Sequence, residues 1–204
     1  MDLEGTPGFV SGHAFRRAAR DLKKEPAFSR CVSIPSRNSS PSRTIASDRT
    51  FFVTSPIRGK RNILQSTRAA ELFLKVLYNY RAQGKYRLHA FVIMPDHFHV
   101  LITVGSDLTV ERALQLIKGG FAYRAARELG FHPPVWEKGF SEVRVLDSGS
   151  FESHKRYIHN NPVARHLVAW SGVYPYSSAH PGFDTDPPPQ RLKPVPAGEV
   201  IRHA

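Results

Sequence analysis

Hydrophobic and polar positions between residues 50 and 161 follow two different periods, and each period predicts one kind of element. Short runs rich in β-branched and aromatic residues predict strands at 50–54, 86–94, 98–104 and 142–146. Apolar positions spaced three and four residues apart predict helices at 68–83, from 107 or 109 to about 129, and from 150 to about 161. The predicted order along the chain is therefore β-α-β-β-α-β-α.

Capping residues and one proline predict where two of these helices begin or end. Asp107 or Thr109 could accept a hydrogen bond from a free backbone N–H at the start of the second helix, and Ser150 could do so for the last helix. Pro162 has no backbone N–H to donate, so it predicts that the last helix stops at Asn161.

The first six predicted elements match a split βαβ unit, which predicts an α+β, ferredoxin-like fold. In such a fold the sheet is antiparallel, helices cover one face, and the other face is left for a ligand or a partner. This domain spans 49–181. Residues 1–48 are predicted to be a disordered basic extension with a short basic helix at 13–24, because the Ser, Pro and Arg residues at 33–43 bury little apolar surface. Residues 182–204 are predicted to be a flexible, proline-rich tail.

Positive charge is concentrated in the predicted domain. The chain of 204 residues has 29 Lys and Arg against 17 Asp and Glu, which gives a net charge of +12. Residues 49–181 hold 18 basic and 9 acidic side chains, a net charge of +9. The distribution therefore argues against a basic tail as the source of the charge and points to a polyanionic partner, most simply nucleic acid.

The cysteine content and the lack of long apolar runs suggest a compartment. Cys31 is the single cysteine of the sequence, so no intrachain disulfide can form, which fits a reducing cytoplasm. No apolar run approaches the roughly 18 residues of a membrane-spanning helix, and the N-terminus does not resemble a secretory signal. We therefore expect a cytoplasmic protein without a membrane partner.

Two histidines and a tyrosine carry the candidate chemistry. His97 and His99 flank Phe98 at the start of the predicted strand at 98–104. If the extended backbone includes His97, both imidazoles leave the same face while Phe98 points to the other. Tyr157 and Asn161 are four apart on the last predicted helix and share a face. If the end of that helix lies beside the strand, a metal ion could take two imidazoles and one amide oxygen and keep open positions. Such mixed ligation suits Mg²⁺ or Mn²⁺ better than a closed zinc site.

A metal beside a tyrosine suggests phosphoryl transfer. A tyrosine hydroxyl ionises only near pH 10 and is a weak nucleophile at neutral pH, so it needs an activated target. A metal on a non-bridging phosphate oxygen polarises the phosphorus and stabilises the charge of the transition state. Attack by Tyr157 on DNA would give a phosphotyrosine intermediate that stores the energy of the phosphodiester bond. A second DNA hydroxyl could reverse the step, so strands would be exchanged without ATP.

Four ordered motifs in the sequence resemble those of the REP-associated tyrosine transposases, which belong to the HUH single-strand transposases with one catalytic tyrosine. The motifs are Met-Pro-Asp-His-Phe-His at 94–99, Trp-Glu-Lys-Gly-Phe at 136–140, Tyr-Ile-His-Asn-Asn-Pro-Val at 157–163 and Tyr-Pro-Tyr-Ser-Ser at 174–178. The resemblance implies a ferredoxin-like HUH fold, a divalent metal, and cleavage and joining of single-stranded DNA. In this family the DNA is typically a repetitive extragenic palindrome folded as a hairpin.

The resemblance also implies a role for each candidate site residue. His97 and His99 match the metal-binding histidines of the family, and Tyr157 matches its nucleophile. Asn161 stands where relatives have a third polar ligand, often a glutamine. The family includes enzymes that act as dimers and others that act as monomers, so the chain is expected to be a monomer or a homodimer.

Other polar and aromatic residues allow two interpretations each. Asp96 is either a turn residue or a neighbour of the metal. His154 and His159 are interpreted as surface or hydrogen-bonded residues rather than ligands, and Trp136 as a packing anchor, with base stacking as the alternative. Spacing does not decide whether the basic side chains hold phosphates or are only solvated, and these are Arg58, Lys60, Arg61, Lys118, Arg124 and Arg127.

We predict a metal-dependent transposase that cleaves and rejoins single-stranded DNA. The main alternative is a non-catalytic DNA-hairpin-binding or regulatory module derived from such a transposase. A replication-initiation or relaxase-type nickase commonly carries three clustered histidines and further domains, which this sequence lacks. A small metallohydrolase that activates water through His97 and His99 would leave no protein–DNA link.

Overall fold

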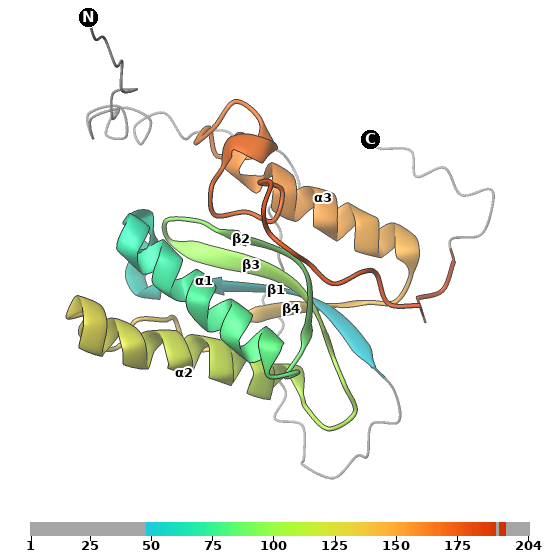
Figure 1. Cartoon of the computed structure of the whole chain (residues 1–204), viewed down its shortest axis with the longest axis horizontal. Coiled ribbons are helices and arrows are strands. Elements are labelled where there is room, and N and C mark those ends of the chain that lie inside the picture. The colour runs from blue at the N-terminus through green and yellow to red at the C-terminus, as the bar shows by residue number, and fades with distance from the viewer. Residues whose placement is uncertain (1–47, 191, 195–204) are drawn as a thin grey trace, which may run out of the picture. The chain divides into compact units, whose positions relative to one another are not determined.

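A computed structural model of the chain describes residues 48–190 and 192–194. Its elements, shown in Figure 1, are β1 (Arg49–Pro56), η2 (Arg58–Lys60), η3 (Ile63–Gln65), α1 (Thr67–Ala82), β2 (Arg87–Ile93), β3 (His97–Val104), α2 (Val110–Leu129), β4 (Ser141–Val145), α3 (Ser148–Ala164) and η4 (Ser171–Val173). The order of strands and α-helices agrees with the predicted β-α-β-β-α-β-α.

The four strands form one antiparallel sheet in the order β2-β3-β1-β4. Consecutive strands β2 and β3 are neighbours, whereas each α-helical connection skips over a strand, as a split βαβ unit requires. The register places Thr54 of β1 and Val92 of β2 on either side of His99. The predicted α+β, ferredoxin-like fold is therefore confirmed.

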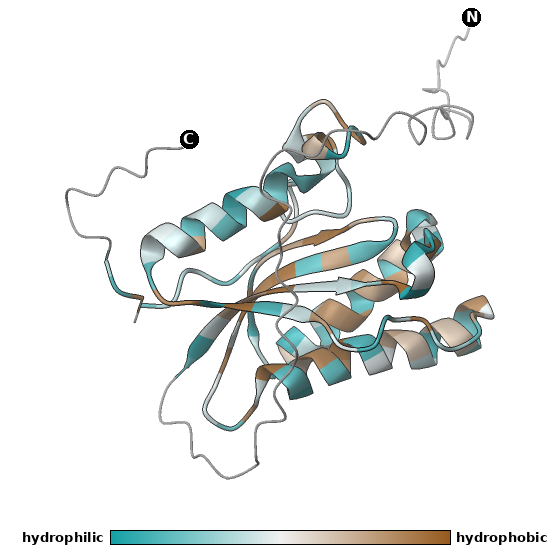
Figure 2. Cartoon of the chain, turned by 180° about the vertical axis from the view of Figure 1, so that it is seen from behind, coloured by the Kyte–Doolittle hydropathy of each residue, from teal (hydrophilic) through white to brown (hydrophobic). Residues whose placement is uncertain are grey.

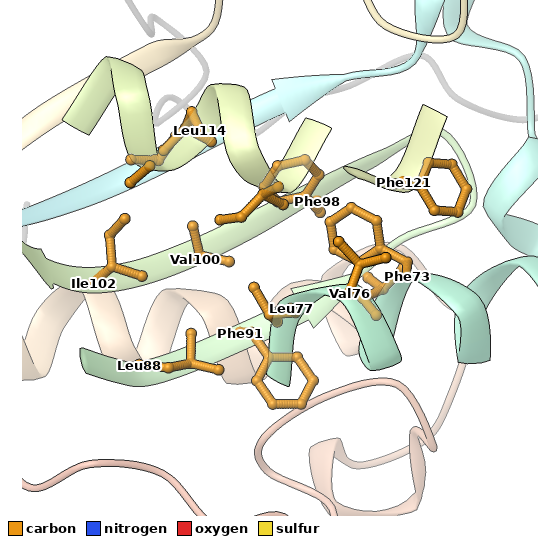
Figure 3. Close-up of a cluster of buried hydrophobic side chains, with 14 of the residues drawn as sticks. Phe73, Val76, Leu77, Leu88, Phe91, Phe98, Val100, Ile102, Leu114 and Phe121 are labelled. Carbon is orange, nitrogen blue, oxygen red and sulfur yellow. The ribbon is translucent and has the colours of Figure 1, made fainter. Parts of the chain in front are cut away.

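Helices α1 and α2 pack side by side on one face of the sheet (Figure 1). Alternation along β3 points Phe98, Val100 and Ile102 into this layer, where Figure 3 shows them between the two helices and the sheet. Gly120 lets α2 approach α1 closely, since a Cβ atom there would lie 2.9 Å from a ring carbon of Tyr80. This layer is the larger of the two hydrophobic cores.

The opposite face of the sheet is partly covered by α3, contrary to the expectation that it would be left free (Figure 1). Apolar side chains on this face form a second core with α3, and they are Phe52, Ala90, Val92, Met94, Leu101, Val145, Phe151 and Ile158. Figure 2 shows that the outward side of α3 is mostly hydrophilic. The helix therefore buries a narrow apolar stripe on the sheet and presents its polar side to solvent.

The ends of two helices test the predicted caps. Thr109 caps α2 by accepting from a backbone N–H, as one of the two predicted alternatives. For α3 the cap is Asp147, whose carboxylate accepts from the N–H of Ser150 at 2.7 Å, so the predicted Ser150 cap is wrong. The predicted stop before Pro162 is also wrong, because α3 includes Pro162 and ends at Ala164. A proline in the last turn removes a single N–H, and the remaining backbone bonds still close the helix.

The start of the expected flexible tail is packed against the domain, which corrects that expectation for these residues. The carboxylate of Asp186 forms an ion pair with Arg81 at 2.8 Å and accepts from the N–H of Leu88 at 2.6 Å. The ring of Phe183 packs edge-on against Phe91, with the ring centres 5.2 Å apart. Side-chain contacts that proline composition does not reveal therefore hold this segment along the edge of β2.

Several sequence predictions fall outside the described residues, namely the helix at 13–24, Cys31, and residues 195–204. Within residues 48–190 and 192–194, no helix is both long enough and apolar enough to cross a membrane.

Candidate active site

His97 and His99 lie side by side on the face of the sheet that α3 covers. Both are almost fully buried, with 7% and 4% of their surface exposed. Their Nε2 atoms are 3.1 Å apart, and the two rings meet edge-on. Strand alternation predicts this common direction, and the short Nε2–Nε2 distance brings two candidate ligand nitrogens together.

Each imidazole is held through its other nitrogen. Nδ1 of His97 lies 2.6 Å from the carboxylate of Asp96, and Nδ1 of His99 lies 2.7 Å from the hydroxyl of Thr54. Burial alone would raise the pKa of Asp96, but its hydrogen bond with His97 and the charges of His97 and Arg165 bring it below the ordinary value. Because the carboxylate is ionised, Nδ1 of His97 donates to it, and Nε2 of the same ring is the nitrogen that faces His99. Such outer partners fix the tautomer and orientation of metal-binding histidines.

The environment of His99 favours its neutral form. Burial lowers its pKa well below the ordinary value, and the charges of His97 and Arg165 lower it further. A histidine must be neutral to bind a metal, so this shift favours ligation at neutral pH.

Asn161 completes the set from α3. Its Nδ2 atom lies 3.3 Å from Nε2 of His99. Its Oδ1 atom is buried and has no hydrogen-bond partner among the described residues. A buried acceptor left unsatisfied costs about 1–3 kcal/mol, so a ligand is expected for it. Two imidazole nitrogens and an orphaned amide oxygen form a donor set that fits a divalent cation, with positions left open for substrate.

Tyr157 lies one helical turn before Asn161 and packs against His99. Its ring centre is 5.4 Å from that of His99 and 5.7 Å from that of Phe52. It remains 46% exposed, so its surroundings are open to a large substrate. The structure therefore brings together all four residues that the sequence singled out.

Phe52 packs beneath the candidate site and contacts three of the rings around it. Its ring lies 5.4 Å from that of His99, 5.7 Å from that of Tyr157 and 4.8 Å from that of His154. Because Phe52 is on β1 and Tyr157 is on α3, the ring sets the spacing between the sheet and the helix at the site.

The other candidate histidines and the tryptophan have structural partners, as predicted. Nδ1 of His154 lies 2.7 Å from the carbonyl oxygen of Ser150, and Nε2 of His159 lies 3.0 Å from the hydroxyl of Ser178. The ring of Trp136 packs against Phe73, Phe98 and Phe121 in the larger core. Asp96, for which two interpretations were open, contacts the site through His97.

Sequence reasoning missed three residues near the site. Phe52 and Thr54 lie on β1 and reach His99 only through the β1–β3 register, which the sequence does not specify. Arg165 is exposed at the end of α3, four residues after Asn161, and its charge acts on Asp96 and His99. The spacing of four from Asn161 was the available signal for Arg165.

The candidate basic residues divide into two groups. Four have hydrogen bonds within the domain, namely Arg61, Lys118, Arg124 and Arg127. Arg58 and Lys60 are exposed, and neither side chain forms a hydrogen bond or ion pair with the rest of the described chain. These two are therefore the better candidates for phosphate contacts.

Comparisons with known proteins identify the family of the chain. The family model described as "Transposase IS200 like" matches residues 52–161, a range that begins at Phe52 and ends at Asn161. The REP-associated tyrosine transposase of Escherichia coli (strain K12) is 24% identical over 133 residues, which cover 64% of this chain and 76% of that protein. A solved structure of a REP-associated tyrosine transposase bound to a REP hairpin superposes with a TM-score of 0.55 and 23% identity. It covers 68% of this chain and 81% of the other, and it shows a shared fold. The chain therefore belongs to the IS200-like transposase family, with the resemblance to REP-associated tyrosine transposases that its motifs predict.

Proposed function

We propose that this chain is a metal-dependent transposase that cleaves and rejoins single-stranded DNA through a covalent link to Tyr157. The observation that carries the proposal is the ring contact of Tyr157 with His99, whose Nε2 atom lies 3.1 Å from that of His97, beside the orphaned Oδ1 of Asn161. A nucleophile and a candidate metal site thus share one surface.

The residues divide the work in the following way. His97, His99 and Asn161 would hold Mg²⁺ or Mn²⁺, which would polarise a non-bridging phosphate oxygen. Asp96 and Thr54 orient the two imidazoles through their Nδ1 atoms. The ring of Phe52, which contacts both His99 and Tyr157, keeps the tyrosine close to these residues.

The covalent step is a transesterification. The hydroxyl oxygen of Tyr157 bonds to phosphorus, the bond from phosphorus to one deoxyribose oxygen breaks, and that oxygen leaves with a proton as an alcohol. The other DNA end stays attached as a phosphotyrosine diester. Attack by a second DNA hydroxyl restores the phosphodiester and the free tyrosine, so no external energy source is consumed. We propose that the tyrosine joins the 5′ phosphate and leaves a 3′-OH.

The proposed substrate is a DNA hairpin of the repetitive extragenic palindrome type. Support comes from the net charge of +9 on residues 49–181 and from the similar protein whose solved structure holds a REP hairpin. Phosphate contacts to such a basic domain make binding strongly dependent on salt.

The test mixes the purified chain with Mn²⁺ or Mg²⁺ and end-labelled single-stranded hairpins taken from the DNA that flanks its own gene. A denaturing gel then reports covalent protein–DNA bands. We expect a band that EDTA removes and that Tyr157→Phe lacks, while the variant still binds the hairpin. Hairpin binding without a covalent band in either metal would contradict the proposal and favour a binding or regulatory module.

A further inference from the structure

A pocket of about 580 Å³ opens beside η2, just after the end of β1. It is lined by Arg58, Gly59, Pro134, Trp136, Glu137 and Lys138. None of these side chains belongs to the candidate metal site. The pocket therefore needs an explanation of its own.

Backbone pairing shows how near the pocket lies to the site. Pro56 is paired with His97 across β1 and β3, and the N–H of Glu137 donates to the carbonyl oxygen of Pro56 at 3.1 Å. His97, Pro56 and Glu137 thus lie on three successive extended segments. Since neighbouring strands are about 4.8 Å apart, the backbone of Glu137 lies about 10 Å from that of His97. That separation is about three stacked nucleotides of a single strand.

The side chain of Glu137 is on the same side of the sheet as the histidines. Trp136 is bridged to Ile57, which makes Glu137 the cross-strand partner of Pro56. Cross-strand partners leave the same face, and Pro56 shares its face with His97. One carboxylate oxygen of Glu137 accepts from the N–H of Gly59 at 2.7 Å, and the other accepts no hydrogen bond from the described part of the chain. The negative charge of Glu137 also interacts with Lys118. A hydrogen-bond acceptor is therefore held in place beside the site.

The rim of the pocket is positively charged. Arg58 and Lys138 line it, and Lys60 follows Arg58 in the same short turn. All three are exposed, and none of their side chains forms a hydrogen bond or ion pair among the residues described. Cations arranged around a single carboxylate match a ligand that carries both phosphates and a hydrogen-bond donor.

The walls of the pocket are fixed before any ligand arrives. Nζ of Lys118, on α2, donates to the carbonyl oxygens of Glu137 and Gly139 at 3.2 and 2.6 Å. The guanidinium of Arg61 donates to the carbonyl oxygen of Pro134 at 2.8 Å. These bonds connect the 134–139 segment to α2 and to the turn after β1, so the pocket keeps its shape without paying the cost of ordering loops on binding.

We propose that this pocket binds an unpaired nucleotide of the DNA strand close to the reacting phosphate, with Glu137 reading the base and Arg58 and Lys138 contacting the backbone. A carboxylate accepts from the exocyclic amino groups of cytosine, adenine and guanine. Thymine offers a single N3–H donor between two carbonyl oxygens, which repel a carboxylate. The pocket therefore selects bases that carry an amino group. This inference rests on the proposed function, because it assumes that the substrate is single-stranded DNA.

The test measures the binding of labelled dC, dA and dT 12-mers by fluorescence anisotropy, with the full chain carrying Tyr157→Phe so that no cleavage interferes. We expect the chain to bind dC and dA about fivefold or more tightly than dT. Glu137→Gln should bring this ratio close to one, because an amide both donates and accepts while its oxygen still accepts from Gly59. Glu71→Gln, the same change on an exposed site of α1, should leave the ratio unchanged.

Two further variants test the backbone contacts. Arg58→Ala and Lys138→Ala should weaken binding of all three 12-mers and reduce the slope of log affinity against log salt by about 0.7 each. Lys75→Ala, an exposed cation on α1, should leave the slope as it is.

Each outcome bears on the inference. Equal affinity for the three 12-mers, or a ratio that Glu137→Gln does not change, overturns base reading and leaves a surface that contacts phosphates alone. A base preference that Glu137→Gln abolishes supports the pocket even if the covalent assay with the unmodified chain fails, in which case the proposed chemistry falls by itself. Absence of any single-strand binding overturns both.

Discussion

The carboxylate of Asp96 and Nδ1 of His97 are 2.6 Å apart, and this contact sets the direction of the candidate metal site. Because the carboxylate accepts from Nδ1, Nε2 is the nitrogen that faces His99, whose own Nε2 is 3.1 Å away. A residue of the β2–β3 turn thereby determines which nitrogen of a buried histidine is available to a cation.

Replacing Asp96 by Asn should weaken metal binding without removing a ligand. The amide leaves the tautomer of His97 undetermined and takes away a negative charge, so Mn²⁺ affinity should fall about 10- to 100-fold. Electron paramagnetic resonance of free Mn²⁺ measures this directly. Asp107→Asn, at an exposed position before α2, serves as the matched control. Equal affinities in the two variants would refute the orienting role of Asp96.

Phe52 should matter for activity more than its contribution to stability suggests. Phe52→Leu keeps an apolar residue but removes ring contacts with His99, His154 and Tyr157, each of which contributes about 0.5–1.5 kcal/mol beyond burial. We expect the melting temperature to fall by a few degrees and formation of the covalent adduct to slow several-fold.

The control for Phe52 is Phe73, a residue of α1 in the larger core on the other side of the sheet. Phe73→Leu removes ring contacts with Phe98, Phe121 and Trp136, so it should lower the melting temperature by a similar amount. It should leave the rate of adduct formation close to that of the unmodified chain. If the two variants lose activity equally, general destabilisation explains the loss, and Phe52 has no special position.

The packed start of the C-terminal segment should make stability depend on acid. The hydrogen bond from Arg81 holds the pKa of Asp186 below 3.8, with a smaller contribution from the N–H of Leu88. A lowered pKa in the folded state stabilises the protein at pH values above 3.8, and the gain is lost as the pH falls through the lowered value. Asp186→Asn should therefore reduce the melting temperature at pH 6, and the difference should shrink towards pH 3.

Differential scanning fluorimetry between pH 3 and pH 6 measures that trend. Asp184→Asn, an exposed neighbour whose side chain makes no hydrogen bond within the described residues, should show a smaller effect at pH 6. A constant difference between Asp186→Asn and the unmodified chain across this range would show that the carboxylate charge does not stabilise the fold.

Arg165 should contact a phosphate of the bound strand. It is exposed at the end of α3, and its charge lowers the pKa of both Asp96 and His99. Its positive charge therefore acts on the candidate site. Arg165→Ala should reduce the slope of log affinity against log salt by about 0.7 for single-stranded DNA. Lys85→Ala, an exposed cation in the turn after α1, should keep the slope of the unmodified chain.

Periodicity predicted the parts of this protein that depend on one element at a time. The strand period placed His97 and His99 on one face of a strand, and the helical period placed Tyr157 and Asn161 on one face of a helix. Both sets of side chains keep those directions in the structure. Four ordered motifs then linked the pairs to one family.

Features that depend on pairing between distant segments were not predictable in this way. Thr54 reaches His99 only because β1 and β3 pair in one register, and a shift of one residue would turn it to the other core. The cap of α3 failed for a local reason instead, because Asp147 and Ser150 are both residue types that suit an N-cap. Asp186 looked like part of a proline-rich tail because its partners, Arg81 and Leu88, are about a hundred residues away in sequence.

The most direct measurement is the mass of the peptide that carries the DNA after reaction with Mn²⁺ and a single-stranded hairpin. Trypsin cleaves after Arg156 and Arg165, so Tyr157 lies in peptide 157–165, apart from Tyr174 and Tyr176. After nuclease trimming, we expect a nucleotide joined through its phosphate to Tyr157 on this peptide, present with metal and absent with EDTA. A modified peptide elsewhere in the chain, or hairpin binding with no modified peptide at all, would contradict it.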